Sequence, residues 1–262
     1  MPFGYLFRRP WSSAARLDDK TVLITGANTG IGKETALDLA KRGARIIMAC
    51  RDMEKAEGAL KEVIQGSGSQ NVVIKKLDLS DTKSIQEFAE TINKGHFLLT
   101  HLLIDLIKRS TPARIINVSS LAHFWGTINL DDINSEKGYD KKTAYSQSKL
   151  ANVLFTRSLA KRLQGMAVTV YSLHPGIVQT DLWRHLNAPQ AAIMKMISPF
   201  TKTSVQGAQT TIYCAVAPEL GTESGGYYSD CAPANCSRPA SDDDTAQKLW
   251  ELSCRMLSVS WD

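Results

Sequence analysis

The strongest constraint on the fold is a regular alternation of short apolar runs with longer amphipathic runs. Residues 21–25 form the first apolar run, which Gly26 ends, and such a run is typical of a buried parallel strand. Strands are expected at 21–25, 44–50, 71–77, 113–118, 167–173 and 225–229, and helices at 31–41, 54–65, 81–93, 96–109, 144–163 and 245–256. This order predicts an α/β fold, a doubly wound parallel sheet with helices on both faces.

One place breaks the alternation. Two helical stretches, 81–93 and 96–109, follow each other with no strand signal between them. Consecutive helices are allowed, but here they interrupt an otherwise regular series of strand–helix–strand units.

Composition limits the class of protein. The 262 residues include 31 Lys and Arg against 26 Asp and Glu, so the net charge is a mild +5. The apolar and charged fractions exclude wholesale disorder, and no nucleic-acid partner is expected. The five cysteines are an odd number without a CxxC pair, which favours reduced thiols facing the cytosol. No linker divides the chain, so residues 20–262 are expected to form one domain after an N-terminal tail, 1–19.

That tail has neither a signal peptide nor an apolar run near the ~20 residues of a membrane span. Its arginines and aromatic residues could touch a membrane surface, but a frayed end is favoured. A cytoplasmic location, or one peripheral to an intracellular membrane such as the endoplasmic reticulum, is therefore expected. The sequence does not give the oligomeric state.

A glycine-rich turn lies between the first expected strand and helix, in the sequence TGANTGIG from Thr25 to Gly32. Glycines at this point let the backbone approach a pyrophosphate, and the helix N-terminus offers free N–H groups. The spacing is G-x-x-x-G-x-G rather than G-x-G-x-x-G. It is not a phosphate-binding Walker A loop, because Glu34 stands where Ser or Thr would bind magnesium.

Two residues at later strand ends bear on the choice of cofactor. Arg51 follows the second strand, where a dinucleotide fold faces the adenosine ribose, and an arginine there accommodates a 2′-phosphate. Asp52 is adjacent, so NAD stays open. Asp78 ends the third strand and suits either a contact to the adenine amino group or a cap on the next helix.

A third signal is Tyr145 with Lys149 at the start of a long helix, after a strand that ends in Ser119 and Ser120. Residues four apart share a helix face, with Cβ atoms ~5–6 Å apart, so the lysine charge can lower the pKa of the tyrosine. Lowering it from ≈10 to ~7 requires about 4 kcal/mol, which one charge at ~4–5 Å supplies.

Together these segments resemble the short-chain dehydrogenase/reductase family, specifically the retinol dehydrogenase subfamily, which reduces retinaldehydes with NADPH. The resemblance rests on the stretches ITGANTGIGKETA, ACRD, KLDLSDTKSI, GHFLLT, ARIINVSS, AYSQSKLANVLFTRSLAKRLQG, HPGIVQT, VQGAQT and YYSDC. They cover most of residues 20–257 and imply a Rossmann-type fold.

The resemblance also implies roles for individual residues. Tyr145 would be the general acid/base, Lys149 would bind the nicotinamide ribose, and Ser120, whose interval to Tyr145 fits better than that of Ser119, would hold the substrate oxygen. An apolar substrate lid would run from Leu182 to Phe200 and include Trp183. NADP(H) would be bound by Tyr145, Lys149 and the residues Gly26, Ala27, Asn28, Thr29, Gly30, Ile31, Gly32, Arg51, Asp78, Pro175, Gly176 and Thr180.

The chain departs from the family pattern where the alternation breaks. FAETINK runs directly into GHFLLT, so the Asn-Asn-Ala-Gly strand is absent, a loss of about 35–40 residues. Ile92 stands where the family has a catalytic Asn. Without that central strand, the strand at 113–118 either moves beside the first strand or leaves a gap. Two hypotheses follow: an NADP(H)-dependent oxidoreductase acting on retinoids or similar apolar carbonyls, and a non-catalytic form that binds nucleotide or a partner.

Overall fold

The computed structural model describes residues 11–80, 95–178 and 201–261, with only the backbone at residue 95. The expected helix at 81–93 therefore lies outside the described residues, whereas the other expected helices and strands form within a few residues of their predicted bounds. The elements are β1 (Thr21–Thr25), α1 (Gly30–Lys41), β2 (Arg45–Cys50), α2 (Met53–Ser67), β3 (Val72–Lys76), α4 (Gly95–Arg109), β4 (Ala113–Val118), the 3-10 helix η2 (Leu121–Trp125), α5 (Lys141–Arg162), β5 (Val168–His174), α7 (Ser204–Val216), η5 (Pro218–Thr222), β6 (Tyr227–Ser229), β7 (Ala232–Pro233), η6 (Pro239–Ser241) and α8 (Asp243–Leu257).

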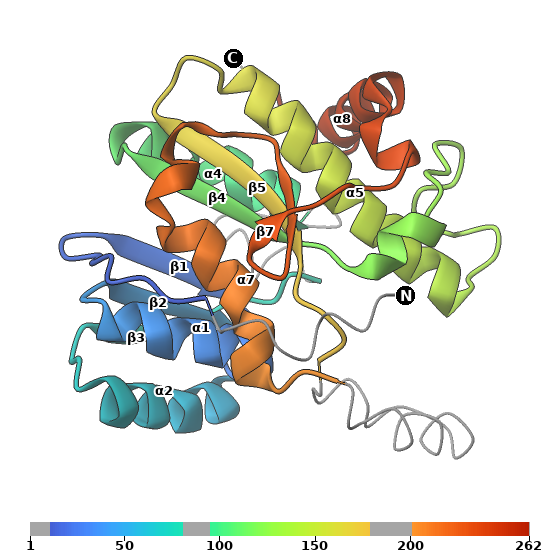
Figure 1. Cartoon of the computed structure of the whole chain (residues 1–262). Helices are drawn as coiled ribbons and strands as arrows, with labels where there is room; N and C mark the ends of the chain where they lie inside the picture. Colours follow the sequence, from blue (N-terminus) through green and yellow to red (C-terminus); the bar gives the residue numbers. More distant parts are fainter. Residues whose placement is uncertain (1–10, 81–94, 179–200, 262) are drawn as a thin grey trace.

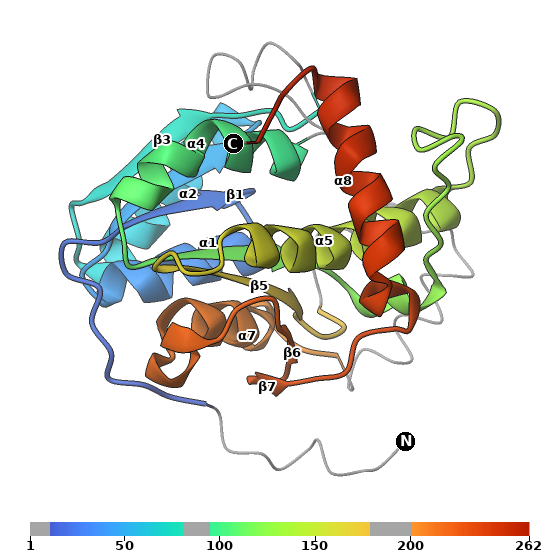
Figure 2. The same cartoon turned by 90° about the horizontal axis from the view of Figure 1, so that it is seen from above.

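Helices cover both faces of the strands, as predicted for a Rossmann-type fold. The helices α1, α2 and α7 lie on one face, and α4 and α5 lie on the other, with α8 beside α5 (Figures 1 and 2). Side chains at the N-cap position fix where several helices begin. The carboxylates of Asp52, Asp140 and Asp242 accept backbone N–H groups at the starts of α2, α5 and α8.

The described strands form two sheets instead of the single sheet that was expected. One has the order β1-β2-β3 and the other β4-β5-β6-β7. Within them all neighbours are parallel except β6 and β7. Among the described residues β4 does not pair with β1, so the alternative in which β4 moves beside the first strand is wrong. The expectation that residues 21–25 form a buried strand is wrong, because Val22–Thr25 stay half-buried on an edge.

The hydrogen-bond directions show which groups face away from each sheet. The Ser119 N–H donates to the Leu173 carbonyl in β5 at 2.7 Å. The Ala113 N–H donates to the Ala167 carbonyl, just before β5, at 3.0 Å. Because successive residues of a strand point to opposite sides, Val118 directs its carbonyl away from β5. This carbonyl accepts the Lys149 ammonium at 3.3 Å and the Asn152 amide at 3.0 Å. The carboxyl end of the open edge of β4 is thus capped by side chains of α5.

Helices and side chains join the two sheets. Ala208, Ile212 and Val216 of α7 pack into the cluster formed by α1 and the first sheet. On the opposite face, Leu99 and Leu103 of α4 pack against residues of the first sheet and of the segment that follows β3. At the other end of the edges, the Lys20 ammonium reaches the Pro112 carbonyl at 3.4 Å.

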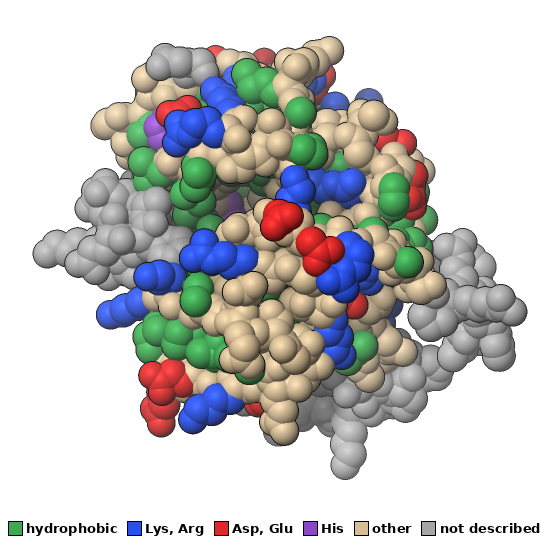
Figure 3. Space-filling view, turned by 90° about the vertical axis from the view of Figure 1, so that its left-hand side faces the viewer, with side chains coloured by type: hydrophobic (Ala, Val, Ile, Leu, Met, Phe, Trp, Pro, Cys, Tyr) green, Lys and Arg blue, Asp and Glu red, His purple; other side chains and the backbone are tan. Residues whose placement is uncertain are grey.

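The side of the molecule on which β1 and β4 begin is shown in Figure 3. Hydrophobic side chains lie along a hollow in this face, with lysine and arginine side chains around it (Figure 3). In the part of the chain that the structure describes, no helix has the length and apolar character needed to cross a membrane.

Candidate functional site

The glycine turn has the backbone geometry that its sequence predicts. Gly26 and Gly30 adopt φ values of +65° and +55°, which disfavour any residue with a Cβ. A Cβ on Gly32 would lie 2.4 Å from the Gly26 carbonyl oxygen, so the turn closes only with glycine there. Thr29 occupies the N-cap position of α1 without a side-chain capping hydrogen bond. The turn therefore presents the N-terminus of α1, which suits an anion such as a pyrophosphate.

The other residues of this turn are packed to different degrees. Ala27 is fully buried in the core of the first sheet, whereas Asn28, Thr29 and Ile31 are half-buried. Beyond the turn, Lys33 pairs with Glu62.

Directly after β2, Arg51 is an exposed cation. Its side chain is 73% exposed, and its Nε lies 4.0 Å from Oδ2 of Asp78. Asp52, the alternative ribose ligand, instead caps α2 and pairs with Lys55 at 2.7 Å. Asp78 accepts the backbone N–H and hydroxyl of Ser80, at 2.9 and 2.6 Å, and these bonds lower the pKa of its carboxyl group.

The tyrosine, lysine and serine come together where β4 ends and α5 begins. Tyr145 is 42% exposed, and the Lys149 ammonium lies 5.5 Å from the centre of its ring. Burial lowers the pKa of Lys149. Ser119 is buried, and its hydroxyl donates to the Lys149 carbonyl at 2.7 Å. Ser120 is half-buried, and its hydroxyl accepts the Ala122 N–H at 3.2 Å. Of the two serines, Ser120 is the more accessible.

The turn after β5 is tied down by Lys202. Gly176 has a φ of +97°, and a Cβ there would lie 2.6 Å from the Lys202 side chain. The Lys202 ammonium contacts the Pro175 carbonyl at 3.4 Å and pairs with Asp230. Thr180, Trp183 and the expected lid at 182–200 lie outside the described residues.

Sequence reasoning missed two features around Ser120. The 3-10 helix η2 follows it directly and exposes apolar side chains: Leu121 is 38%, Phe124 44% and Trp125 73% exposed. Two histidines, His123 and His174, also contact the backbone at Ser120 and Leu121. The adjacent aromatic residues Phe124 and Trp125, in the sequence SSLAHFW, were the signal from which this exposed apolar surface could have been predicted.

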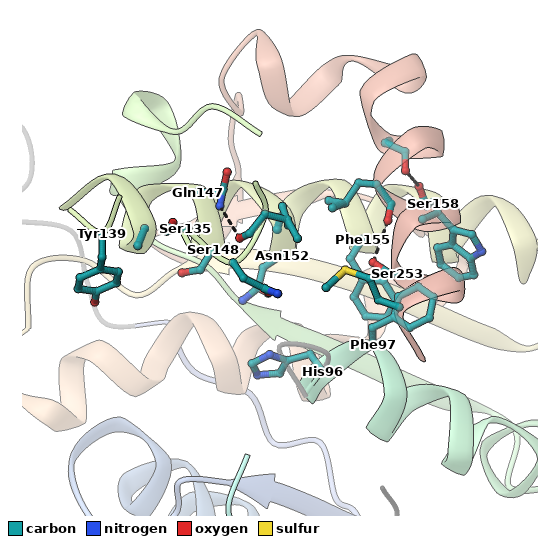
Figure 4. A pocket seen from close by; sticks show the side chains of 18 residues that line it. His96, Phe97, Ser135, Tyr139, Gln147, Ser148, Asn152, Phe155, Ser158 and Ser253 are labelled. Atoms are coloured by element: carbon teal, nitrogen blue, oxygen red, sulfur yellow. Dashed lines mark hydrogen bonds between the residues drawn. The ribbon is translucent and has the colours of Figure 1, made fainter. Parts of the chain in front are cut away.

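A cavity of about 240 Å³ lies beside α5 (Figure 4). Its lining includes polar side chains such as Gln147, Ser148 and Asn152 and aromatic ones such as Phe97 and Trp250, while Tyr145, Lys149 and Ser120 do not line it. The cavity is therefore separate from the tyrosine–lysine–serine group.

Comparison with known proteins defines the class. The family description "short chain dehydrogenase" matches residues 20–96 and 93–191. The chain therefore belongs to the short-chain dehydrogenase family, whose members are oxidoreductases. Within it the chain falls in the retinol dehydrogenase subfamily: it is 46% identical to human retinol dehydrogenase 12, over 94% of this chain and 89% of that protein, and 45% identical to human retinol dehydrogenase 11, over 96% and 90%.

Solved structures support the fold. An uncharacterised protein from Mycobacterium paratuberculosis is 31% identical with a TM-score of 0.77, covering 97% of this chain and 100% of that one. A short-chain dehydrogenase from Shigella flexneri complexed with NADP is 20% identical with a TM-score of 0.65, covering 84% and 100%. At this identity the second likeness shows the fold alone.

The same comparisons locate the interruption seen in the sequence. The two family matches meet at residues 93–96. The alignment with human retinol dehydrogenase 12 spans 282 positions, whereas 94% of 262 residues is about 246, so about 36 positions of that relative have no counterpart here. The break between matches falls in the segment between β3 and α4, where the missing strand was expected.

Proposed function

We propose that this chain is an NADP(H)-dependent oxidoreductase that interconverts retinaldehydes and retinols or similar apolar carbonyls and alcohols. The observation that carries the proposal is that Lys149 contacts both the ring of Tyr145 and the carbonyl of Val118, at the end of the strand that leads directly to Ser120. The carboxyl ends of parallel strands form the edge at which open α/β sheets bind ligands.

The residues at the ends of β1, β2 and β3 fit a dinucleotide. The close approach of Gly32 to the Gly26 carbonyl holds the turn at the N-terminus of α1, where a pyrophosphate would bind. Arg51 is exposed, whereas Asp52 is engaged as a helix cap, so the pair favours a 2′-phosphate over a ribose hydroxyl. Asp78 lies beside Arg51, where it would meet the adenosine part.

In the proposed reaction NADP(H) supplies or accepts the hydride. Ser120 would orient the substrate oxygen through its hydroxyl, and Tyr145 would donate the proton to that oxygen during reduction or remove it during oxidation. Lys149 would bind the nicotinamide ribose. Pro175 and Gly176, fixed by Lys202, would flank the nicotinamide.

Two observations support an apolar substrate. The relatives named above are retinol dehydrogenases. In addition, η2 exposes Leu121, Phe124 and Trp125 directly after Ser120, where they would contact the apolar part of a bound carbonyl compound. A location in the cytoplasm or on the endoplasmic reticulum would bring such a chain to membrane-dissolved substrate, and co-sedimentation with phospholipid vesicles tests the membrane contact.

A specific observation favours the second candidate, a non-catalytic nucleotide-binding form. Lys149 donates to the Val118 carbonyl on the open edge of β4. This contact competes with its proposed role at the nicotinamide ribose.

Titration of the purified chain with NADPH, followed by a retinaldehyde reduction assay, tests both candidates. Binding with reduction supports the enzyme, and binding without detectable reduction supports the second candidate. Absence of NADPH binding contradicts the enzyme and the nucleotide-binding form, and leaves a non-catalytic form that binds a partner. Tyr139→Phe, at an exposed tyrosine just before α5, is the matched control for loss of a hydroxyl at Tyr145.

A further inference from the structure

The peptide group between Ser120 and Leu121 is contacted at both polar atoms by histidine side chains. The Ser120 carbonyl oxygen lies 2.7 Å from Nδ1 of His123, and the Leu121 N–H donates to Nδ1 of His174 at 3.1 Å. The two rings come from different elements, His123 from η2 and His174 from the end of β5.

The remaining contacts fix which nitrogen of each ring carries the proton. Nε2 of His123 accepts the Ser237 N–H at 3.0 Å, so a neutral His123 carries its proton on Nδ1 and donates it to the Ser120 carbonyl. Nδ1 of His174 accepts the Leu121 N–H, so a neutral His174 carries its proton on Nε2. The two imidazoles therefore have opposite tautomers, one donating to the peptide group and one accepting from it.

The surroundings keep both rings neutral. His123 is fully buried and packs against the rings of Phe124 and Tyr227, at 4.3 and 4.9 Å between centroids. Burial lowers its pKa, opposed by the contact with the Ser120 carbonyl. Burial lowers the pKa of His174 to about 4; Lys202 and His123 add to this effect, and Asp230 opposes it.

We propose that His123 and His174 are positioning residues that orient the Ser120–Leu121 peptide group and, through it, the Ser120 hydroxyl. A peptide group is planar, so bonds to its oxygen and its N–H together prevent its rotation. Rotation of this plane would move the Ser120 side chain, and reacting groups tolerate errors of only about 0.5 Å. The proposal rests on the proposed function, because it assigns a purpose to the Ser120 position.

The contact of His123 with Ser237 extends this arrangement to the segment between β7 and η6. Ser237 is buried, and its hydroxyl also contacts the His123 carbonyl at 3.4 Å. Three separate parts of the chain therefore meet at one peptide group: η2, the end of β5 and the C-terminal segment.

Amide hydrogen exchange tests the arrangement without requiring turnover. The Ala122 N–H donates to the Ser120 hydroxyl, so its exchange rate reports on the Ser120 side chain. We expect His174→Leu to speed the exchange of both the Leu121 and Ala122 amides at least fivefold. His174→Asn, whose Oδ1 takes the place of Nδ1 as acceptor, is expected to restore most of the protection. His101→Leu is the matched control, because His101 packs against Trp261 and is not in contact with this peptide group.

Kinetics separate positioning from general stability. We expect His174→Leu to lower kcat about tenfold, the size of one lost hydrogen bond in the transition state, with little change in NADPH affinity. The effect is expected to vanish in a Ser120→Ala background, because a residue that acts only through Ser120 has nothing left to orient.

Unchanged Ala122 exchange in His174→Leu would overturn the proposal, as would losses of kcat that multiply when His174→Leu and Ser120→Ala are combined. An inactive wild-type chain that nevertheless shows the expected exchange pattern contradicts the proposed function and supports the positioning of Ser120 by the histidines.

Discussion

The strands β2 and β4 carry the same Arg-Ile-Ile sequence in different surroundings. In β2, Ile46 is fully buried and the strand pairs with β1 on one side and β3 on the other. In β4, Ile115 and Ile116 are only half-buried, and the only strand paired with β4 among the described residues is β5. The sequence of a strand predicts that it pairs, whereas its neighbours decide on how many sides it pairs.

The residues proposed to bind the cofactor and those proposed to carry out catalysis belong to different sheets. The glycine turn and Arg51 belong to the first sheet, and Tyr145, Lys149 and Ser120 belong to the second. Within each sheet the register is fixed by backbone hydrogen bonds, but the position of one sheet relative to the other depends on helix packing. Hydride transfer requires both to be placed correctly, so perturbations of each sheet should have separable effects.

The largest expected effect is on the chemistry of the second sheet. Tyr145→Phe is expected to lower kcat for retinaldehyde reduction by about 10²–10⁴-fold, because the proton donor is lost. NADPH affinity, measured by fluorescence titration, should stay nearly unchanged, whereas Lys149→Ala should reduce both. Substantial turnover by the Tyr145→Phe protein would assign the proton to another group.

The next expected effect comes from restoring a strand between the sheets. Insertion of the segment present in the relatives at residues 93–96 is expected to raise kcat/KM about 10²-fold, the scale of a misplacement near 1 Å. A strand beside β4 would supply the donor that Val118 now takes from Lys149 and Asn152. Activities of the two proteins within a few-fold of each other would show that the segment is dispensable.

A smaller effect is expected from a change in the first sheet, where it should alter cofactor binding alone. Arg51→Ala is expected to weaken NADPH binding about 10–100-fold through the lost charged contacts, with little change for NADH. Turnover at saturating NADPH should persist, in contrast to Tyr145→Phe. Equal losses for the two cofactors would contradict the assignment of Arg51 to the 2′-phosphate.

Removal of one methyl group from α7 tests the packing that joins the two sheets. Ile212 of α7 is 2% exposed and packs in the cluster of the first sheet, so Ile212→Val is expected to cost about 0.5–1.5 kcal/mol in urea unfolding. The matched control is Ile177→Val, at a residue 51% exposed, where the change should stay within about 0.5 kcal/mol. Equal effects at both sites would mean that α7 contributes little to joining the sheets.

The smallest expected effect is on the pH dependence of stability. The folded state lowers the pKa of His174 from 6.5 to about 4, so the unfolded chain binds the proton first as the pH falls. The stability present above pH 6.5 is therefore lost as the pH falls from 6.5 towards 4. Because His174 is partly accessible to solvent, it contributes about 1 kcal/mol to the free energy of unfolding that is lost over this pH range. His174→Asn should show a flatter profile between these pH values, and an identical slope would contradict this origin.

Much of the first sheet could be predicted from local sequence. The run at 21–25, the glycines up to Gly32 and the position of Arg51 depend on residues close together in the chain, and the strand bounds and turn geometry are confirmed. The edge position of β1 could not be inferred from its apolar residues, because it depends on a segment that this chain lacks. The break in alternation did show where that segment would lie.

The region around Ser120 was harder to predict. Tyr145 and Lys149 are four residues apart on one helix, so their proximity follows from helix geometry, and the structure brings Ser120 to the same end of β4. The contact of His123 with Ser237 joins residues 114 positions apart and leaves no local pattern. The capping box that starts α7, Thr203 with Gln206, was present in the sequence, and α7 was nevertheless not predicted.

The division into two sheets also bears on aggregation. Among the described residues, the two sheets have four strand edges without a paired strand, and an unpaired edge can recruit a strand from another molecule. The outer edges carry the usual protection: β3 ends in the exposed Lys75 and Lys76, and β7 is a two-residue strand that contains Pro233. At the inner edges, β1 is Thr-Val-Leu-Ile-Thr, without a charged or proline residue of this kind, and β4 contains two adjacent isoleucines, while its carboxyl end is capped by side chains of α5. The outer edges are therefore protected by their own residues, whereas the inner edges depend on the helices and side chains packed around them, and we expect association between molecules at high concentration to begin where that packing loosens.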